Sequence, residues 1–149
     1  MNPRVDELDQ VADKIERHIN AAVERWHQLP DKTLLFRPSE NDWSAKEIIG
    51  HLIDSASNNH QRFVRLQLTD RLDFPDYGQD NIHWVKIQSY QHHPWHDLLG
   101  LWRYFNLQLA RIIRAQTSIT LFDLMTDYLR HLENHLDQLA DTIEAFKKS

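Results

Sequence analysis

Apolar residues recur at steps of three and four along the first part of the chain, the period of a helix with one buried face. The series comprises Val5, Leu8, Ala12, Ile15, Ile19, Ala22, Val23 and Trp26. Pro30 follows it, and proline removes a backbone donor and ends a helix. The pattern therefore predicts a first long helix over about residues 5–28. Residues 29–42, which include Pro30 and Pro38, are expected to be a connecting segment.

A second long helix is expected to begin after Ser44. Ser44 and Glu47 have the spacing of a capping box, in which the hydroxyl and the carboxylate each accept a hydrogen bond from a free amide of the first turn. The helix is predicted to run to about Asp70. The following segment, 71–81, contains proline and glycine and is predicted to be a loop.

The second half of the chain predicts one short and two long helices. The short helix is expected over 81–90. Pro94 suits the first position of a fourth helix that runs to about Ala115. After a break at 116–120, Thr120 is expected to cap a last helix that ends near Lys147.

These elements together predict the fold class. No window alternates apolar and polar residues with a period of two, so no sheet is expected. Four long helices and one short helix, joined by loops of ordinary length, indicate an all-α four-helix bundle with an additional short helix. No repeat, low-complexity tract or linker divides the chain, so residues 1–149 are expected to form a single domain.

Composition narrows the class of function. The net charge is −5 with histidine neutral, which gives no electrostatic footprint for nucleic acid. The absence of cysteine excludes disulfides, thiolate metal sites and a cysteine nucleophile. The charged N-terminal region does not resemble a signal peptide, and no apolar run approaches the roughly 20 residues that span a bilayer. We therefore expect a cytoplasmic protein with no nucleic-acid partner and no membrane partner.

Histidine is abundant, with ten residues, and two of them are spaced for a metal site. His131 and His135 are one helical turn apart, so both imidazoles project from one face of the last helix. Such a pair forms half of a transition-metal site. The alternative from the spacing alone is a pair of solvated histidines.

A third ligand is offered by the second helix. His51 lies in a polar strip of this helix together with Glu47, Ser55, Asn58 and Arg62. A polar strip faces either water or a polar pocket, and the pattern does not decide between them. Taken alone, His51 is interpreted as an ordinary exposed or half-buried histidine.

Two short motifs resemble the DinB-like superfamily, which includes the YfiT and bacillithiol-transferase branches. In that family a helix starts at Trp–Ser/Thr, carries a Glu and then a His one turn on, and a C-terminal helix bears His-x-x-x-His-x-x-Gln. The matching residues here are Trp43, Ser44, Glu47, His51, His131, His135 and Gln138. The resemblance implies a homodimeric four-helix bundle in which three histidines hold a divalent metal.

The resemblance then implies a function. His51, His131 and His135 would be the metal ligands, and the ion would be zinc, nickel, iron or manganese. The chain would be a metal-dependent enzyme that acts on a small-molecule substrate, either a thiol S-transferase using a low-molecular-weight thiol or a hydrolase or isomerase. The alternative is a non-catalytic dimeric bundle, a binding or stress-response protein whose metal site is structural or vestigial.

Further residues are candidates for the surroundings of the ion. Glu47, Asp127 and Gln138 are placed to accept a hydrogen bond from a ligand imidazole and so fix its tautomer. The more ordinary interpretation makes Glu47 a capping residue and Asp127 a surface charge. The candidates for the mouth of the site are Asn58, Arg62 and Tyr128, each of which has an ordinary surface or core role as its alternative.

Overall fold

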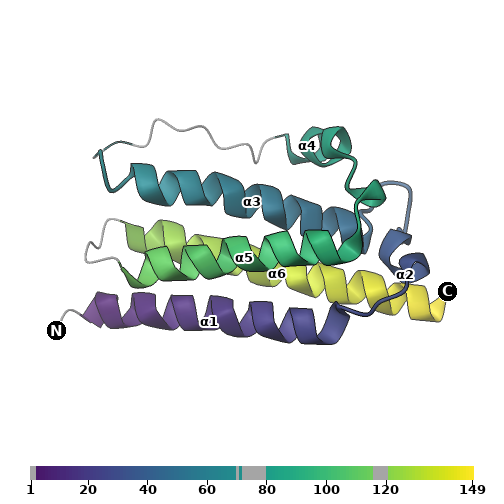
Figure 1. The fold of residues 1–149 in the computed structure, drawn as a ribbon, viewed down its shortest axis with the longest axis horizontal. Coiled ribbons are helices and arrows are strands. Elements are labelled where there is room, and N and C mark those ends of the chain that lie inside the picture. Colours follow the sequence, from purple (N-terminus) through teal and green to yellow (C-terminus); the bar gives the residue numbers. More distant parts are fainter. Residues whose placement is uncertain (1–2, 70, 72–79, 116–120) are drawn as a thin grey trace.

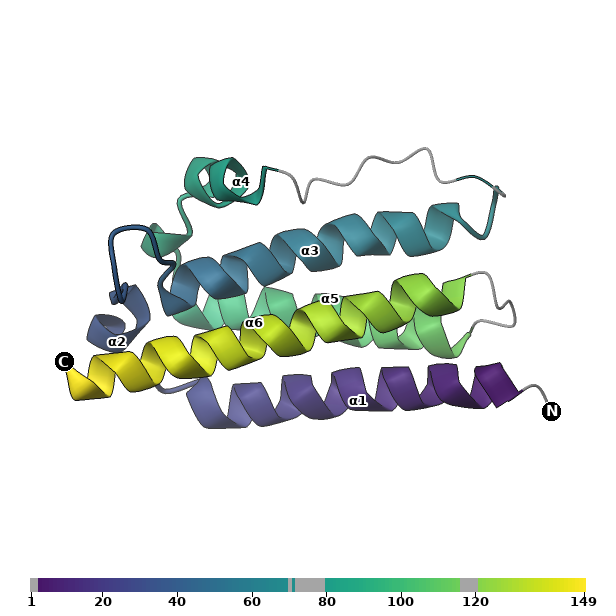
Figure 2. The ribbon, with the colours of Figure 1, turned by 180° about the vertical axis from the view of Figure 1, so that it is seen from behind.

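The computed structural model describes residues 3–69, 71, 80–115 and 121–149, and most of these residues belong to four long helices. The helices are α1 (Pro3–Trp26), α3 (Ala45–Arg65), α5 (Trp95–Arg114) and α6 (Phe122–Lys148). They lie side by side, and α1 and α3 each pack against both α5 and α6 (Figure 1 and Figure 2). The described residues contain no strand, so the predicted all-α bundle is confirmed.

Three short elements gather at the end of the bundle where α3 begins and α6 ends (Figure 1). They are α2 (Asp31–Leu35), α4 (Asn81–Gln88) and the 3-10 turn η1 (Tyr90–His92). The prediction that 29–42 is only a connecting segment was wrong. Helix α2 follows Pro30 and buries Thr33 and Leu34, but five residues are too few to produce a periodic pattern.

Some helix ends also differ from the prediction. Helix α3 stops at Arg65 and not at about Asp70, because the residues after Leu66 contribute little packing, with Leu68 80% exposed. The short helix over 81–90 is interrupted at Ser89, whose φ of 53° is left-handed and separates α4 from η1. Pro94 is the residue before the first turn of α5 and not its first residue. Thr120 lies outside the described residues.

An apolar core fills the space between the four long helices. Its largest fully buried side chain is Trp102 of α5, and the same core includes Ile15, Phe63 and Leu132 from the other three helices. Each such side chain stabilises the fold by about 1.5–3 kcal/mol relative to leaving it exposed. Within the described ranges, no helix has the length and apolarity that crossing a bilayer requires.

Helix α3 is the most deeply placed of the long helices. All residues from 45 to 56 are buried, because α5 and α6 contact this helix and so do α2, α4 and η1. The sequence did not decide whether the polar strip of this helix faces water or a pocket. In the structure, this part of the strip faces the interior. His51, Ser55 and Asn58 are 1%, 3% and 9% exposed.

Two contacts fix α4 and η1 against α3. Tyr90 of η1 packs its ring directly on Gly50, where a Cβ atom would lie 2.0 Å from the ring. The Tyr90 hydroxyl donates a hydrogen bond to Oδ1 of Asp54, and Gln88 Nε2 donates to the same oxygen at 2.7 Å. This segment is thereby held next to the first turns of α3, where the candidate site lies.

Candidate metal centre

Three imidazoles converge between α3 and α6. His51 lies in the second turn of α3, and His131 and His135 lie one turn apart on the facing side of α6. The ring of His135 is centred 4.5 Å from each of the other two rings, and the His51 and His131 rings are 5.3 Å apart. One nitrogen from each histidine can be chosen so that all three lie within 4.8 Å of one another.

The spacing of the nitrogens suits a shared ion. An ion held about 2.0–2.1 Å from two nitrogens separates those nitrogens by about 2.8–3.0 Å at octahedral angles and about 3.3–3.4 Å at tetrahedral angles. The Nε2 atoms of His51 and His135 are 3.1 Å apart. His131 completes a group of three nitrogen donors, and three ligands leave coordination positions on an ion open.

Gln138 determines which nitrogen of His135 faces the other rings. Its side-chain carbonyl accepts a hydrogen bond from His135 Nδ1 at 2.8 Å. A neutral imidazole has one N–H, so with the proton on Nδ1 the lone pair lies on Nε2, the atom that faces His51. Gln138 is thus one of the predicted surrounding residues that the structure does bring to the histidines.

Burial keeps the imidazoles neutral. The pKa of His51 is lowered to about 3, first because the ring is buried and then because His135 and His131 lie beside it. Burial also lowers the pKa of His135, an effect that the hydrogen bond to Gln138 partly opposes. A neutral ring is the form that binds a metal, so these groups are ready to act as ligands near neutral pH.

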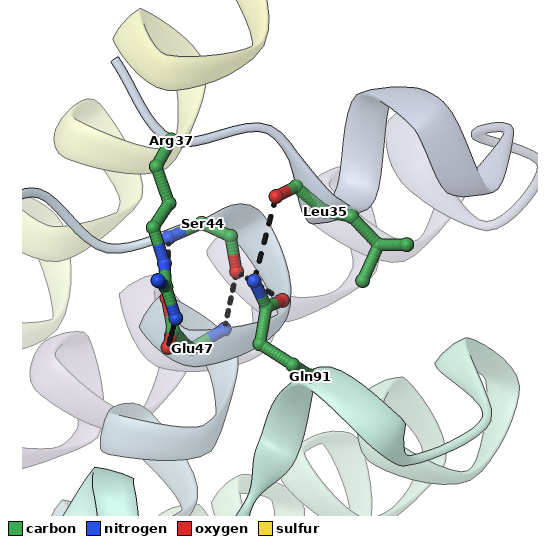
Figure 3. A network of polar contacts seen from close by, with 5 residues as sticks. All are labelled: Leu35, Arg37, Ser44, Glu47 and Gln91. Atoms are coloured by element: carbon green, nitrogen blue, oxygen red, sulfur yellow. Dashed lines mark hydrogen bonds and ion pairs between the residues drawn. The ribbon is translucent and has the colours of Figure 1, made fainter. Parts of the chain in front are cut away.

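Glu47 has a different role from the one considered for it beside the histidines. Figure 3 shows it at the N-terminus of α3, where it completes the capping box with Ser44 and pairs with Arg37. Burial opposes its ionisation, but the hydrogen bonds from Arg37 and Ser44 outweigh burial and lower the pKa of the carboxyl. The capping function predicted for Ser44 and Glu47 is confirmed.

Two other candidates have partners outside the histidine cluster. Asp127 is exposed and pairs with Arg130 at 3.2 Å, as its interpretation as a surface charge requires. Tyr128 is 4% exposed, packs edge-on against Phe63 and donates a hydrogen bond to Asn106. These two residues are surface and core residues.

Asn58 and Arg62 follow His51 by two and three turns on the same face of α3. Asn58 is buried and Arg62 is half-buried. Their place on the helix is therefore in line with the histidine cluster, further along the bundle.

Sequence reasoning gave no role to Trp43, although it belongs to the motif. The Trp43 ring lies 4.9 Å from the ring of His51 and 6.4 Å from that of His135. The available signal was its place immediately before the capping residue Ser44, a position where an apolar side chain fixes how the chain enters the helix.

A cleft of about 790 Å³ adjoins the centre. Trp43, Glu47 and Gln138 line its side nearest the histidines, and α4 and η1 contribute Val85, Lys86, Tyr90 and His92. Segments distant in sequence form this cleft, so no pattern along the chain indicated it.

A comparison with family models decides the assignment that the motifs suggested. The model of the DinB superfamily matches residues 14–147. The chain belongs to the DinB superfamily. Searches among curated proteins and among solved structures find no match. The three histidines that the resemblance implied as ligands, His51, His131 and His135, are the ones that lie together in the structure.

Proposed function

We propose that this DinB-superfamily chain is a divalent-metal-dependent enzyme that acts on a small molecule. The observation that carries the proposal is the convergence of His51, His131 and His135, whose candidate ligand nitrogens lie within 4.8 Å of one another. Three imidazole ligands with open positions are typical of catalytic zinc sites, whereas structural sites are closed by four ligands. A donor set of three nitrogens suits zinc, nickel, iron(II) or manganese.

The reaction class we propose is transfer of a low-molecular-weight thiol to an electrophile, or a hydrolysis or isomerisation at the same site. A divalent ion in this position would supply Lewis acidity, which lowers the pKa of a thiol or water ligand towards neutrality. The cleft of about 790 Å³ beside the centre has room for a small substrate.

The protein's own contribution is to hold three nitrogen donors in fixed positions. Burial keeps His51 unprotonated, and Gln138 fixes both the proton and the ring orientation of His135. The capping box and the Arg37–Glu47 pair fix the start of α3 one turn before His51. Donors that are held in place need little rearrangement when an ion and a substrate bind.

Cobalt(II) substitution tests this proposal. Chelator-treated protein is titrated with cobalt(II), and its visible absorption is recorded before and after addition of cysteine as a small thiol probe. We expect a saturable visible spectrum and, with cysteine, a new near-ultraviolet charge-transfer band that reports sulfur binding to the metal.

Two variants separate the site from incidental binding. His51→Ala is expected to lose the cobalt spectrum, while His60→Ala, a histidine on the same helix outside the cluster, is expected to keep it. A cobalt spectrum that cysteine leaves unchanged would contradict the thiol-transfer class. No specific cobalt spectrum in the wild type would favour the non-catalytic bundle.

A further inference from the structure

Trp43 stands between the histidine cluster and the cleft. Its ring lies 4.9 Å from the ring of His51 and 6.4 Å from that of His135, tilted by 36° to both. The same side chain lines the cleft of about 790 Å³. In the part of the chain that the structure describes, none of the three clustered histidines lines this cleft. The indole therefore contacts two of the clustered histidines and forms part of the wall of the cleft on that side.

Polar contacts that involve α2, α3 and η1 hold the backbone that follows Trp43, and Figure 3 shows the residues that make them. Ser44 accepts a hydrogen bond from the Glu47 amide in the capping box, and its hydroxyl donates to Gln91 of η1 at 2.7 Å. Gln91 in turn donates to the carbonyl of Leu35 at the end of α2, and Arg37 pairs with Glu47. The wall is thus anchored to α2, α3 and η1 together.

The chemistry of the indole gives this wall a function. A tryptophan side chain is large, has only two rotatable bonds and presents a flat apolar face. A molecule in the cleft that approaches Nε2 of His51 or His135 on the side of Trp43 meets this ring, and passes its edge or displaces it. Small ligands can pass more easily than bulky ones, so the ring discriminates by size and shape.

We propose that Trp43 is a positioning and specificity-determining residue that shields His51 and His135 from the cleft and selects the molecules that reach them. This inference rests on the proposed function for its biological meaning. Its physical content is accessibility, which can be measured without a metal.

The test is the reactivity of individual histidines in chelator-treated full-length protein. Diethyl pyrocarbonate acylates neutral imidazoles, and peptide mass spectrometry gives the rate at each histidine. In Trp43→Ala we expect acylation of His51 and His135 to be at least about tenfold faster than in the wild type, because a local barrier to access is removed. His96, whose side chain is 83% exposed, serves as the internal reference with an unchanged rate.

A matched variant controls for loss of a tryptophan elsewhere. Trp84→Ala, on the exposed face of α4, is expected to leave the rates at His51 and His135 unchanged. If Trp43→Ala fails to fold, Trp43→Leu keeps an apolar residue before the cap and is expected to raise the same two rates. Wild-type rates at His51 and His135 in a folded Trp43→Ala or Trp43→Leu protein would overturn the proposal.

A second measurement tests selection directly in the cobalt(II) form. Azide and imidazole serve as a small and a bulky ligand, and their affinities are read from the visible spectrum. Trp43→Ala is expected to increase the affinity for imidazole relative to azide by about tenfold, equivalent to about 1.4 kcal/mol. An unchanged ratio would overturn the proposed selectivity. Failure of the wild type to bind cobalt would count against the proposed function, and the histidine reactivities would still decide the role of Trp43.

Discussion

The hydrogen bond between Gln138 and His135 controls the candidate centre at the scale of single residues. Gln138 accepts from Nδ1 of His135, which leaves Nε2 with a lone pair 3.1 Å from Nε2 of His51. In metal sites, the partner of the second ring nitrogen orients the ligand and raises its basicity. Metal binding at the candidate centre would therefore depend on a residue that is not itself a ligand.

Replacing Gln138 with leucine should weaken metal binding. We expect Gln138→Leu to lower the affinity for zinc by about 10–100-fold, because the His135 ring loses the acceptor that fixes its tautomer. Gln138→Glu keeps an acceptor and should retain most of the affinity. Competition with a chromophoric chelator measures both variants. Equal affinities for the wild type and Gln138→Leu would show that the ring is oriented by packing alone.

Asp54 gives a second prediction at this scale. Burial raises the pKa of its carboxyl above the ordinary 3.8, against the hydrogen bonds from Tyr90 and Gln88. Between the unfolded and the folded pKa of Asp54, the folded state binds more protons than the unfolded chain. The stabilisation from the protonated carboxyl is therefore fully present below about pH 3.8. It is lost as the pH rises through the folded pKa. Asp54→Asn is neutral at every pH and should remove this loss.

Urea unfolding at pH 4 and pH 7 checks the Asp54 prediction. The stability of Asp54→Asn relative to the wild type should be greater at pH 7 than at pH 4. A difference that is the same at both values would mean that Asp54 titrates alike in the folded and unfolded states.

The sequence could predict which histidines lie together in the candidate centre but not most of their surroundings. The spacing of His131 and His135 follows from helix geometry, so it could be read directly from the chain. The burial of His51 could not, because it depends on the other elements that contact α3, and α5 and α6 among them are distant in sequence. The same reason explains why Trp43 and the cleft were missed.

At the scale of elements, the packing of η1 on α3 depends on Gly50. A Cβ atom at this position would lie 2.0 Å from Cδ2 and 2.3 Å from Cγ of Tyr90. Cγ is the base of the ring and cannot swing aside, so the ring and η1 must shift. Gly100 of α5 is also within a helix, but a Cβ there meets nothing within 4 Å.

The two glycines form a matched pair for mutation. Gly50→Ala should destabilise the protein by about 1–3 kcal/mol through overpacking, in spite of the better helix propensity of alanine. Gly100→Ala should stabilise it by about 0.5–1 kcal/mol, because propensity acts there without a clash. Chemical denaturation of both variants provides the comparison. Stabilisation by Gly50→Ala would contradict the close packing of Tyr90 on α3.

Local signals predicted the long helices well and the short elements poorly. The capping box at Ser44 and Glu47 located the start of α3, because capping depends on residues within one turn. Helix α2 and the break at Ser89 were missed, since both depend on packing at the end of the bundle. The homodimer implied by the resemblance stays a prediction.

At the scale of the whole molecule, metal binding should couple stability to pH. The pKa of His51 is already held at about 3, below the ordinary value of 6.5, so the folded state binds fewer protons than the unfolded chain between these values. Stability from this group is present above about pH 6.5 and is lost as the pH falls, with a slope of up to about 1.4 kcal/mol per pH unit. A bound ion, which also requires neutral imidazoles, extends the same trend to all three ligands.

Thermal melts with and without chelator, from about pH 7.5 to 5, test this coupling. We expect a higher melting temperature without chelator at pH 7.5 and a difference that closes as the pH falls. A difference of the same size at every pH would rule out competition between protons and the ion.

Metal content is the measurement that tests the central claim most directly. Protein produced without a histidine tag and without added metal is purified and submitted to elemental analysis, together with His51→Ala and the control His60→Ala. We expect about one divalent ion per chain in the wild type and in His60→Ala, and loss of the ion in a folded His51→Ala protein. A wild-type protein that contains no ion, and whose melting temperature is the same with and without added zinc, would contradict the assignment of His51, His131 and His135 as a metal centre.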